Sequence, residues 1–190
     1  MKTITSVNRQ HEEAGFSLTE ALIVICLLSV VSGFAVLNVG AVLPAMSANA
    51  AMNQTVAQLR RGRELALAQR RNIELRFLGT KQIQLVRYNI PSGTTVLSTI
   101  TLDGRNQFRL FSGIPDTPDG FGNGSAVSLS GTASWMFLSN GILVDSATNP
   151  ANGSIFLGQS QHPETARAIT ILGSTGRIRD YKWTRNTWVH

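Results

Sequence analysis

The residues whose chemistry is easiest to interpret lie near the amino terminus, where Glu20 directly precedes an uncharged run from Ala21 to Leu43. A carboxylate at the start of a membrane-length apolar helix is unfavourable unless a cation meets it, and such residues usually have a function. Cleavage between Gly15 and Phe16 would release an ammonium group that could serve as this cation. We therefore interpret Glu20 as the partner of a new amino terminus at Phe16.

The sequence GFSLTE at residues 15–20, followed by the long apolar run, resembles the class III leader of type IV pilins and pseudopilins. The resemblance implies that a prepilin peptidase cleaves after Gly15 and methylates the new amino terminus at Phe16. It also implies that Glu20 neutralises the amino terminus of a neighbouring subunit during assembly. The expected partners are therefore the prepilin peptidase, the inner membrane, and other pilins or pseudopilins, which pack through their amino-terminal helices.

Two other interpretations of the amino-terminal segment remain open. The tripeptide Ala-Asn-Ala at 48–50 resembles a signal-peptide cleavage site, although the apolar run exceeds the usual ~7–15 residues. An uncleaved single-span anchor, tethering a basic periplasmic domain for an unrelated purpose, is the third interpretation. The resemblance to pilins implies a single-pass protein of the bacterial inner membrane, with its carboxyl-terminal domain in the periplasm.

The apolar run and the segment behind it predict one long helix from Phe16 to about Arg71. At a rise of about 1.5 Å per residue, Ala21–Leu43 would cover about 35 Å, enough to cross a bilayer core of about 30 Å with some tilt. A bend is expected at Gly40 or Pro44. Apolar residues at helical spacing predict the face that packs on a sheet, namely Met52, Val56, Leu59 and Ala66.

Alternation with a period of two begins after Asn72 and predicts an antiparallel β-sheet domain. Glycines and prolines predict a loop from Gly113 to Gly124, and Asn-Gly pairs at 140–141 and 152–153 predict tight turns. We also expect His162 to Glu164 to form an exposed loop. A long helix packed on antiparallel strands is an α+β fold. The predicted strands are 73–77, 82–88, 96–102, 108–111, 126–129, 134–138, 142–144, 154–157 and 168–172.

The order of these elements resembles the GspH/FimT branch of minor pseudopilins, found in type II secretion systems and type IV pili. The resemblance rests on the arginine-rich helix end running into a strand (63–77), the FLSNG turn at 137–141, and the closing strand at 169–171. It implies a structural subunit that assembles into, or primes, a pseudopilus or pilus. The expected division is a leader at 1–15, a transmembrane helix at 16–44, its amphipathic continuation at 45–72, and a β-rich periplasmic domain at 73–190.

No catalytic constellation is recognisable in the sequence, so we do not expect an enzyme. The three histidines are far apart, and Cys26 is the single cysteine, so neither a zinc site nor an intrachain disulfide is expected. No cofactor is expected either. The formal net charge of +6 and the pI of about 10.4 favour an anionic partner, although a solvated basic surface also explains them.

A stripe of basic and aromatic residues near the carboxyl terminus makes DNA the alternative partner. If residues 176–185 are extended, the odd-numbered side chains share one face, where arginines could meet phosphates and aromatic rings could stack on bases. The sequence GRIR at 176–179 also matches the Gly-Arg-x-Arg motif implicated in DNA binding by FimT-type minor pilins. The competing interpretation is an ordinary last strand with arginines in water. The stripe comprises Arg177, Arg179, Tyr181, Trp183 and Arg185.

The three interpretations of the amino-terminal segment predict different mature proteins. Sequencing the amino terminus of the protein recovered from cells with an active prepilin peptidase should give Phe16, with the leader removed. A terminus at Ala51 would instead indicate an ordinary signal peptide. An intact Met1 would indicate an uncleaved anchor and would contradict the role assigned to Glu20.

Overall fold

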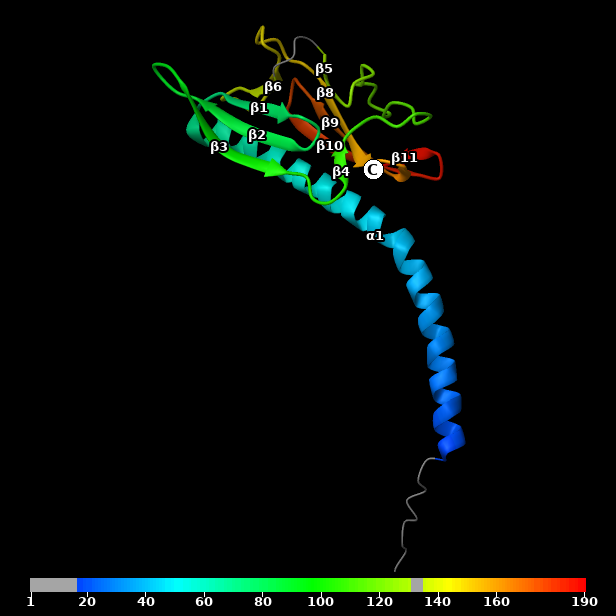
Figure 1. Ribbon diagram of the computed structural model, residues 1–190. Helices are drawn as coiled ribbons and strands as arrows, with labels where there is room; N and C mark the ends of the chain where they lie inside the picture. Colours follow the sequence, from blue (N-terminus) through cyan, green and yellow to red (C-terminus); the bar gives the residue numbers. More distant parts are fainter. Residues whose placement is uncertain (1–16, 131–134) are drawn as a thin grey trace, which may run out of the picture. The chain divides into compact units, whose positions relative to one another are not determined.

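The computed structural model describes residues 17–130 and 135–190, with the side chains of 34–41 outside the description. Within these ranges a single helix, α1 (Leu18–Gln69), is followed by strands β1 to β11 (Figure 1). The chain divides into two compact units, Met1–Ala41 and Val42–His190, and each is considered by itself. A helix followed by antiparallel strands confirms the predicted α+β class.

The first unit is helical from Leu18 onward. The predicted apolar segment, Ala21–Leu43, lies entirely within α1, and the helix runs through Pro44 without ending there. Within the described residues, no helical stretch is both long enough and apolar enough to span a membrane. The observed bounds of α1 agree with the predicted helix to within about two residues, the usual uncertainty of helix ends.

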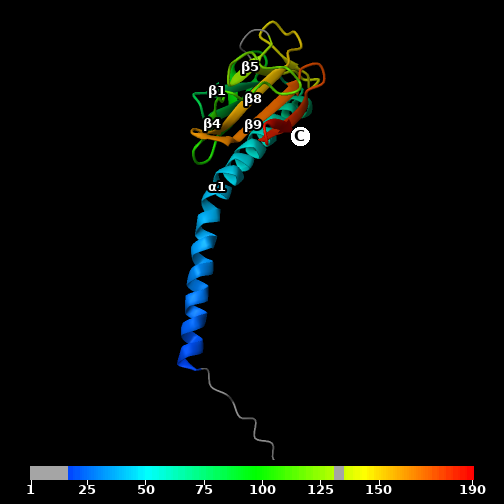
Figure 2. The ribbon, with the colours of Figure 1, turned by 90° about the vertical axis from the view of Figure 1, so that its right-hand side faces the viewer.

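The strands of the second unit form two antiparallel sheets where the sequence predicted one sheet domain. Sheet A has the order β3-β2-β1-β6-β7, and sheet B has the order β11-β10-β9-β8-β4, with β5 also paired to β8. Figure 2 shows β8 and β9 side by side in sheet B. The bounds are β1 Ile73–Leu78, β2 Gln82–Tyr88, β3 Thr94–Thr101, β4 Asn106–Phe108, β5 Val127–Leu129, β6 Trp135–Phe137, β7 Leu143–Val144, β8 Gly153–Gln159, β9 His162–Leu172, β10 Arg177–Thr184 and β11 Thr187–Val189.

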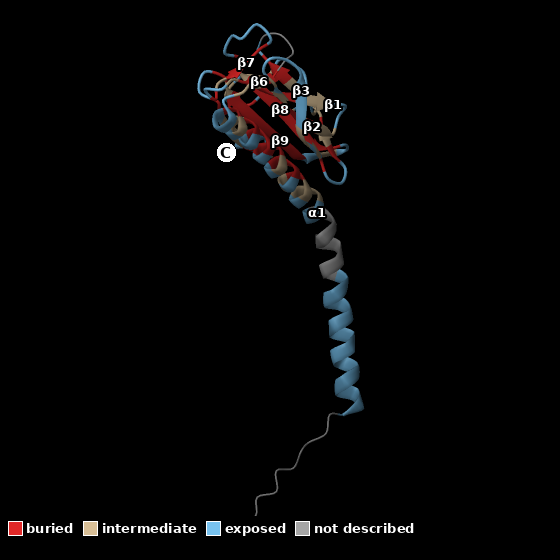
Figure 3. Cartoon of the chain, turned by 90° about the vertical axis from the view of Figure 1, so that its left-hand side faces the viewer, coloured by how far each residue is buried: buried red, intermediate tan, exposed pale blue. Residues whose placement is uncertain are grey.

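The core of the second unit joins α1 to both sheets. The predicted helix stripe is confirmed, because Met52, Val56, Leu59 and Ala66 are all buried. They belong to one cluster with residues of β1, β2, β6, β8 and β9. Figure 3 shows the contrast between the buried strands β8 and β9 and the exposed amino-terminal part of α1.

Arg63 adds a polar connection between α1 and two turns of the sheets. Its Nε donates a hydrogen bond to the Gly141 carbonyl at 3.0 Å, and a terminal nitrogen donates to the Thr175 carbonyl at 3.1 Å. A single guanidinium therefore satisfies carbonyls from the turn after β6 and the turn before β10. Such bonds to a charged donor are stronger than bonds between neutral groups.

Most predicted strands are confirmed, and three predictions are wrong. The strand predicted at 108–111 lies at Asn106–Phe108, because Asn106 pairs with the end of β8. His162, predicted to lie in an exposed loop, begins β9 by pairing with Gln159. The Asn152-Gly153 pair makes no hairpin, since Gly153 already belongs to β8. Strand β11 was not predicted, and Ser134 lies outside the described residues.

The glycine at 153 is required for packing and not for a turn. A Cβ atom added to Gly153 would overlap the indole ring of Trp135, which lies against this backbone position from β6. The glycine therefore lets sheet A and sheet B approach each other closely.

We expect Gly153→Ala to destabilise the domain by about 1–3 kcal/mol, because the added methyl group forces the buried ring to move. Denaturant unfolding of the purified chain in neutral detergent measures this loss. Trp135→Leu makes room for the methyl group, so the double variant should lose less stability than the sum of the two single variants. Strictly additive losses would contradict the proposed overlap.

Candidate functional site

Glu20 lies in the first turn of α1, which is capped by Ser17. The Ser17 hydroxyl accepts a hydrogen bond from the Glu20 N–H at 3.3 Å, and the Ser17 carbonyl accepts one from the Ala21 N–H at 3.1 Å. Ser17 is therefore the N-cap, and the Ser-x-x-Glu spacing is that of a capping box. The exposed Glu20 carboxylate has no ion-pair partner among the described residues. Gly15 and Phe16 lie outside the described residues.

The helix that follows Glu20 leaves its apolar side chains uncovered. Residues 17–33 are exposed at every position, so this part of α1 has no buried face. A helix that is apolar all round is normally buried against lipid or other protein. Within residues 17–33, the large apolar side chains that are more than half exposed are Leu18, Leu22, Ile23, Ile25, Leu27, Leu28, Val30 and Val31.

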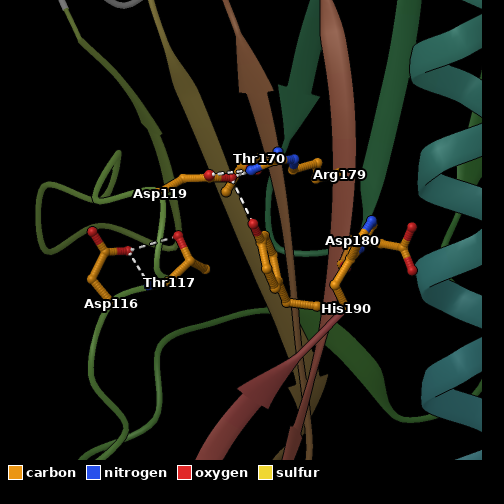
Figure 4. A network of polar contacts seen from close by, with 8 residues as sticks. Asp116, Thr117, Asp119, Thr170, Arg179, Asp180 and His190 are labelled. Carbon is orange, nitrogen blue, oxygen red and sulfur yellow. Dashed lines mark hydrogen bonds and ion pairs between the residues drawn. The ribbon is translucent and has the colours of Figure 1, made fainter.

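The predicted basic and aromatic stripe on β10 is organised around an aspartate of the loop between β4 and β5. One Asp119 oxygen accepts hydrogen bonds from the Thr170 hydroxyl at 2.5 Å and the Tyr181 hydroxyl at 2.9 Å. The other oxygen pairs with the Arg179 guanidinium at 2.8 Å (Figure 4). Arg179 and Tyr181 thus share a face of β10, as the alternation predicted, and both bind Asp119.

The loop that carries Asp119 is itself folded against sheet B. The Asp116 carboxylate accepts hydrogen bonds from the backbone of Thr117 at 2.7 Å and of Gly122 at 2.8 Å, which shapes the loop. The Trp188 indole N–H of β11 donates to the Pro115 carbonyl at 2.9 Å. The glycines and prolines of this segment predicted a loop. In the structure the loop lies over part of the basic and aromatic stripe. Beneath it, a small apolar cluster contains Phe156, Ala168, Tyr181 and Trp188.

The charges of this network stabilise the ionised aspartate. Burial by itself raises the pKa of the Asp119 carboxyl, but hydrogen bonds from Thr170 and Tyr181, together with the Arg179 charge, outweigh it and hold the pKa below its ordinary value. Burial and the bond to Asp119 raise the pKa of the Tyr181 hydroxyl. At neutral pH the network therefore consists of a carboxylate, a neutral phenol and a guanidinium.

The remaining members of the stripe are not held by Asp119. Arg177 is exposed at the start of β10, and Trp183 packs edge-on against Trp188 with ring centroids 5.2 Å apart. Arg185 lies beyond the strand, in the turn to β11, with a φ of 48°. The five predicted residues therefore divide into a pair bound to the loop through Asp119, namely the buried Tyr181 and the half-buried Arg179, and three separate side chains.

Three polar residues that interact with, or belong to, β9 and β10 of sheet B were not predicted as functional residues from the sequence. Asp119 lies in a loop with no local pattern to mark it. Arg167 interrupts the apolar strand β9, a signal that could have been noticed, and Lys182 lies on the even-numbered face of β10. Together with Trp183 and Arg185, Arg167 and Lys182 line a cavity of about 600 Å³.

Other reactive side chains form no recognisable centre in the described chain. No group of three or more histidine, cysteine or acidic side chains among the described residues could hold a metal ion. His162 Nδ1 lies 2.8 Å from Glu164 Oε1 on β9, and Cys26 is exposed on α1.

The comparisons with known proteins concern the fold. No protein-family model matches the sequence, and neither does any curated protein sequence. The chain is similar to the type IV minor pilin FimU of Pseudomonas aeruginosa, with 16% identity and a TM-score of 0.49, over 75% of this chain and 92% of that one. It is also similar to the minor pseudopilin EpsH of the Vibrio cholerae type 2 secretion system, with 13% identity and a TM-score of 0.48, over 72% and 97% of the two chains.

We expect the contribution of Asp119 to stability to depend on pH. Because its folded pKa lies below the ordinary value, this contribution is complete above about pH 4 and is lost as the pH falls through the folded pKa. Asp119→Asn should cost about 1–3 kcal/mol at neutral pH, and this cost should shrink below pH 4. Denaturant unfolding between pH 7 and pH 3 measures both quantities.

The exposed Asp103 provides the matched control for this measurement. Asp103→Asn should change the free energy of unfolding little at any of these pH values, since the residue is exposed. A cost of Asp119→Asn that stays constant down to pH 3 would contradict the role of the ionised carboxylate.

Proposed function

We propose that this protein is a membrane-anchored minor pseudopilin, a structural subunit that assembles into, or primes, the fibre of a type II secretion system or a type IV pilus. Its leader is removed between Gly15 and Phe16 by a prepilin peptidase, and Phe16 is then methylated. The observation that carries this proposal is the uncovered apolar helix 17–33 with Glu20 in its first turn. Such a surface requires lipid before assembly and neighbouring helices after it.

The exposed part of α1 has features suited to packing against other helices. Ser29 and Gly33 lie four positions apart, so both fall on one side of the helix and allow a close approach of a neighbouring backbone. The Ser29 hydroxyl is satisfied within the helix, because it donates to the Ile25 carbonyl at 2.7 Å. In an apolar fibre core, the Glu20 carboxylate would be stabilised by the amino terminus of an adjacent subunit.

The carboxyl-terminal part of α1 is already used within the chain. Met52, Leu59 and Ala66 are buried against the sheets. Contacts between subunits therefore fall to the amino-terminal part of the helix and to the surface of the β domain. In this arrangement the helix anchors the subunit in the inner membrane and the β domain lies in the periplasm.

A DNA-binding minor pilin is the second candidate, with the same fold and processing. The exposed Arg177 and Arg185 and the indole of Trp183 favour it, because cations and stacking surfaces suit a nucleic-acid strand. Arg179 and Tyr181 are engaged by Asp119, so a strand that used them would first have to displace the loop. For this reason DNA binding remains the alternative.

The proposed role of Glu20 in assembly can be separated from any effect of this residue on the start of the helix. Glu20→Ala should leave membrane insertion normal and abolish incorporation into the fibre. Glu20→Gln should fail in the same way, because glutamine can complete a capping box but carries no charge to meet an ammonium group. Carbonate extraction of membranes measures insertion, and recovery of the subunit in sheared fibres measures assembly.

The control is Ser17→Ala, which removes the capping hydroxyl and keeps the charge. It should cost about 1 kcal/mol of helix stability while leaving the ion pair available, so incorporation should persist. Normal incorporation of Glu20→Gln would contradict the proposed ion pair.

A further inference from the structure

A cavity of about 600 Å³ lies at the end of sheet B that adjoins Ala45 of α1. Its wall contains cationic side chains from three positions, Arg167 of β9, Lys182 of β10 and Arg185 of the turn to β11. Trp183 also lines the cavity. The cavity therefore combines cationic residues with an aromatic residue.

Arg167 is a buried cation without a carboxylate partner. Arg167 is only 4% exposed, and its guanidinium donates hydrogen bonds to Asn49 Oδ1 at 2.8 Å, to two backbone carbonyls of β9 and, at 3.4 Å, to the Ala45 carbonyl of α1. None of the ion pairs in the described chain includes it. Burial lowers its pKa, as expected for a charge removed from water without an anion. An anion in the cavity would offset this cost.

The pairing of β9 with β10 adds a second unfavourable charge. Lys182 lies directly opposite Arg167 in the register of the two strands, and like charges in this position repel each other. Lys182 is exposed and has no ion-pair partner within the described residues. Glu164 is the one carboxylate among the described residues that line the cavity, and its Oε1 lies 2.8 Å from His162 Nδ1. Three cationic side chains therefore share the cavity with one carboxylate, which leaves an excess of positive charge.

The turn that carries Arg185 also favours a binding role. Arg185 and Asn186 connect Thr184 to Thr187, and both have positive φ values, 48° and 63°. Such two-residue turns favour Asn and Gly, and arginine is unfavourable at the first position. Asparagine would suit the backbone conformation of position 185 better than arginine does. The turn therefore gives no reason for an arginine at this position, whereas the cavity does.

We propose that this cavity binds the phosphate group of an anionic phospholipid. Guanidinium and ammonium groups are the donors that phosphate requires, and an indole ring is favoured at the level of lipid headgroups. Ala45 follows closely after Leu43 and Pro44, where the strongly apolar run gives way to a segment containing serine, asparagine and glutamine, so the cavity would lie near the membrane surface. This assignment depends on the membrane anchoring proposed above. It adds a specific lipid contact that holds the β domain near the bilayer before the subunit is extracted.

Calorimetric titration of the full chain in a neutral detergent tests this site. The probes are dihexanoyl phosphatidylglycerol, the zwitterionic dihexanoyl phosphatidylcholine, inorganic phosphate and a short single-stranded oligonucleotide. We expect saturable binding of phosphatidylglycerol and at least tenfold weaker binding of the other three. Lys182→Gln and Arg185→Asn should each weaken phosphatidylglycerol binding at least tenfold, and Arg185→Asn should leave stability unchanged or raised because asparagine tolerates positive φ.

Two positions elsewhere provide matched control variants. Lys81→Gln removes a lysine charge outside the cavity. Arg70→Asn removes an exposed arginine that also has a positive φ, 49°, and it lies about 37 Å along α1 from Ala45. Both controls should bind phosphatidylglycerol like the unaltered chain. Equal losses in the controls would indicate attraction by net charge and would overturn the site.

The other probes distinguish the possible sources of the phosphate group. Equal affinities for the two lipids, or for lipid and inorganic phosphate, would overturn recognition of an anionic headgroup. An oligonucleotide that binds more tightly and depends on the same two residues would replace lipid by nucleic acid. Since the titration requires neither leader cleavage nor a fibre, Glu20→Gln should bind lipid normally. Its failure to assemble therefore tests the proposed function independently of the lipid site.

Discussion

The uncovered apolar surface of α1 is the constraint on which the rest of this protein depends. Its own domain buries the carboxyl-terminal part of the helix through Met52, Leu59 and Ala66, whereas residues 17–33 remain exposed on every side. Exposed apolar area of this extent is unfavourable in water. In the proposed function the helix exchanges lipid for the helices of neighbouring subunits, and the Glu20 charge makes the second environment specific.

The position of the glutamate suits both the helix start and an external partner. The Ser17 hydroxyl caps its backbone N–H, and its carboxylate lies favourably at the positive end of the helix dipole. Its carboxylate is also free for an intermolecular cation, since no described residue pairs with it. In the proposed assembly, a helix start that is already ordered by its cap would reduce the entropy lost when a neighbouring subunit binds.

The basic side chains of the β domain differ in whether a carboxylate pairs with them. Asp119 holds Arg179 and Tyr181 and connects a long loop to sheet B, so these residues contribute to stability. The cavity lined by Arg167 and Lys182 also contains the Glu164 carboxylate, but neither cation forms an ion pair within the described residues. The presence of Asp119 beside Arg179 therefore distinguishes that arginine from the two cations of the cavity.

The sequence by itself determined the features that depend on local periodicity. These are the long helix, its buried stripe and most of the strands, because helical and extended backbones impose spacings that are visible over a few residues. Only the tertiary structure decided which charges meet, as in Asp119 with Arg179 and Arg167 opposite Lys182. It also decided that Gly153 admits the Trp135 ring and makes no turn. These contacts join residues distant in sequence, and their partners are fixed by sheet register and loop path, which no local pattern encodes.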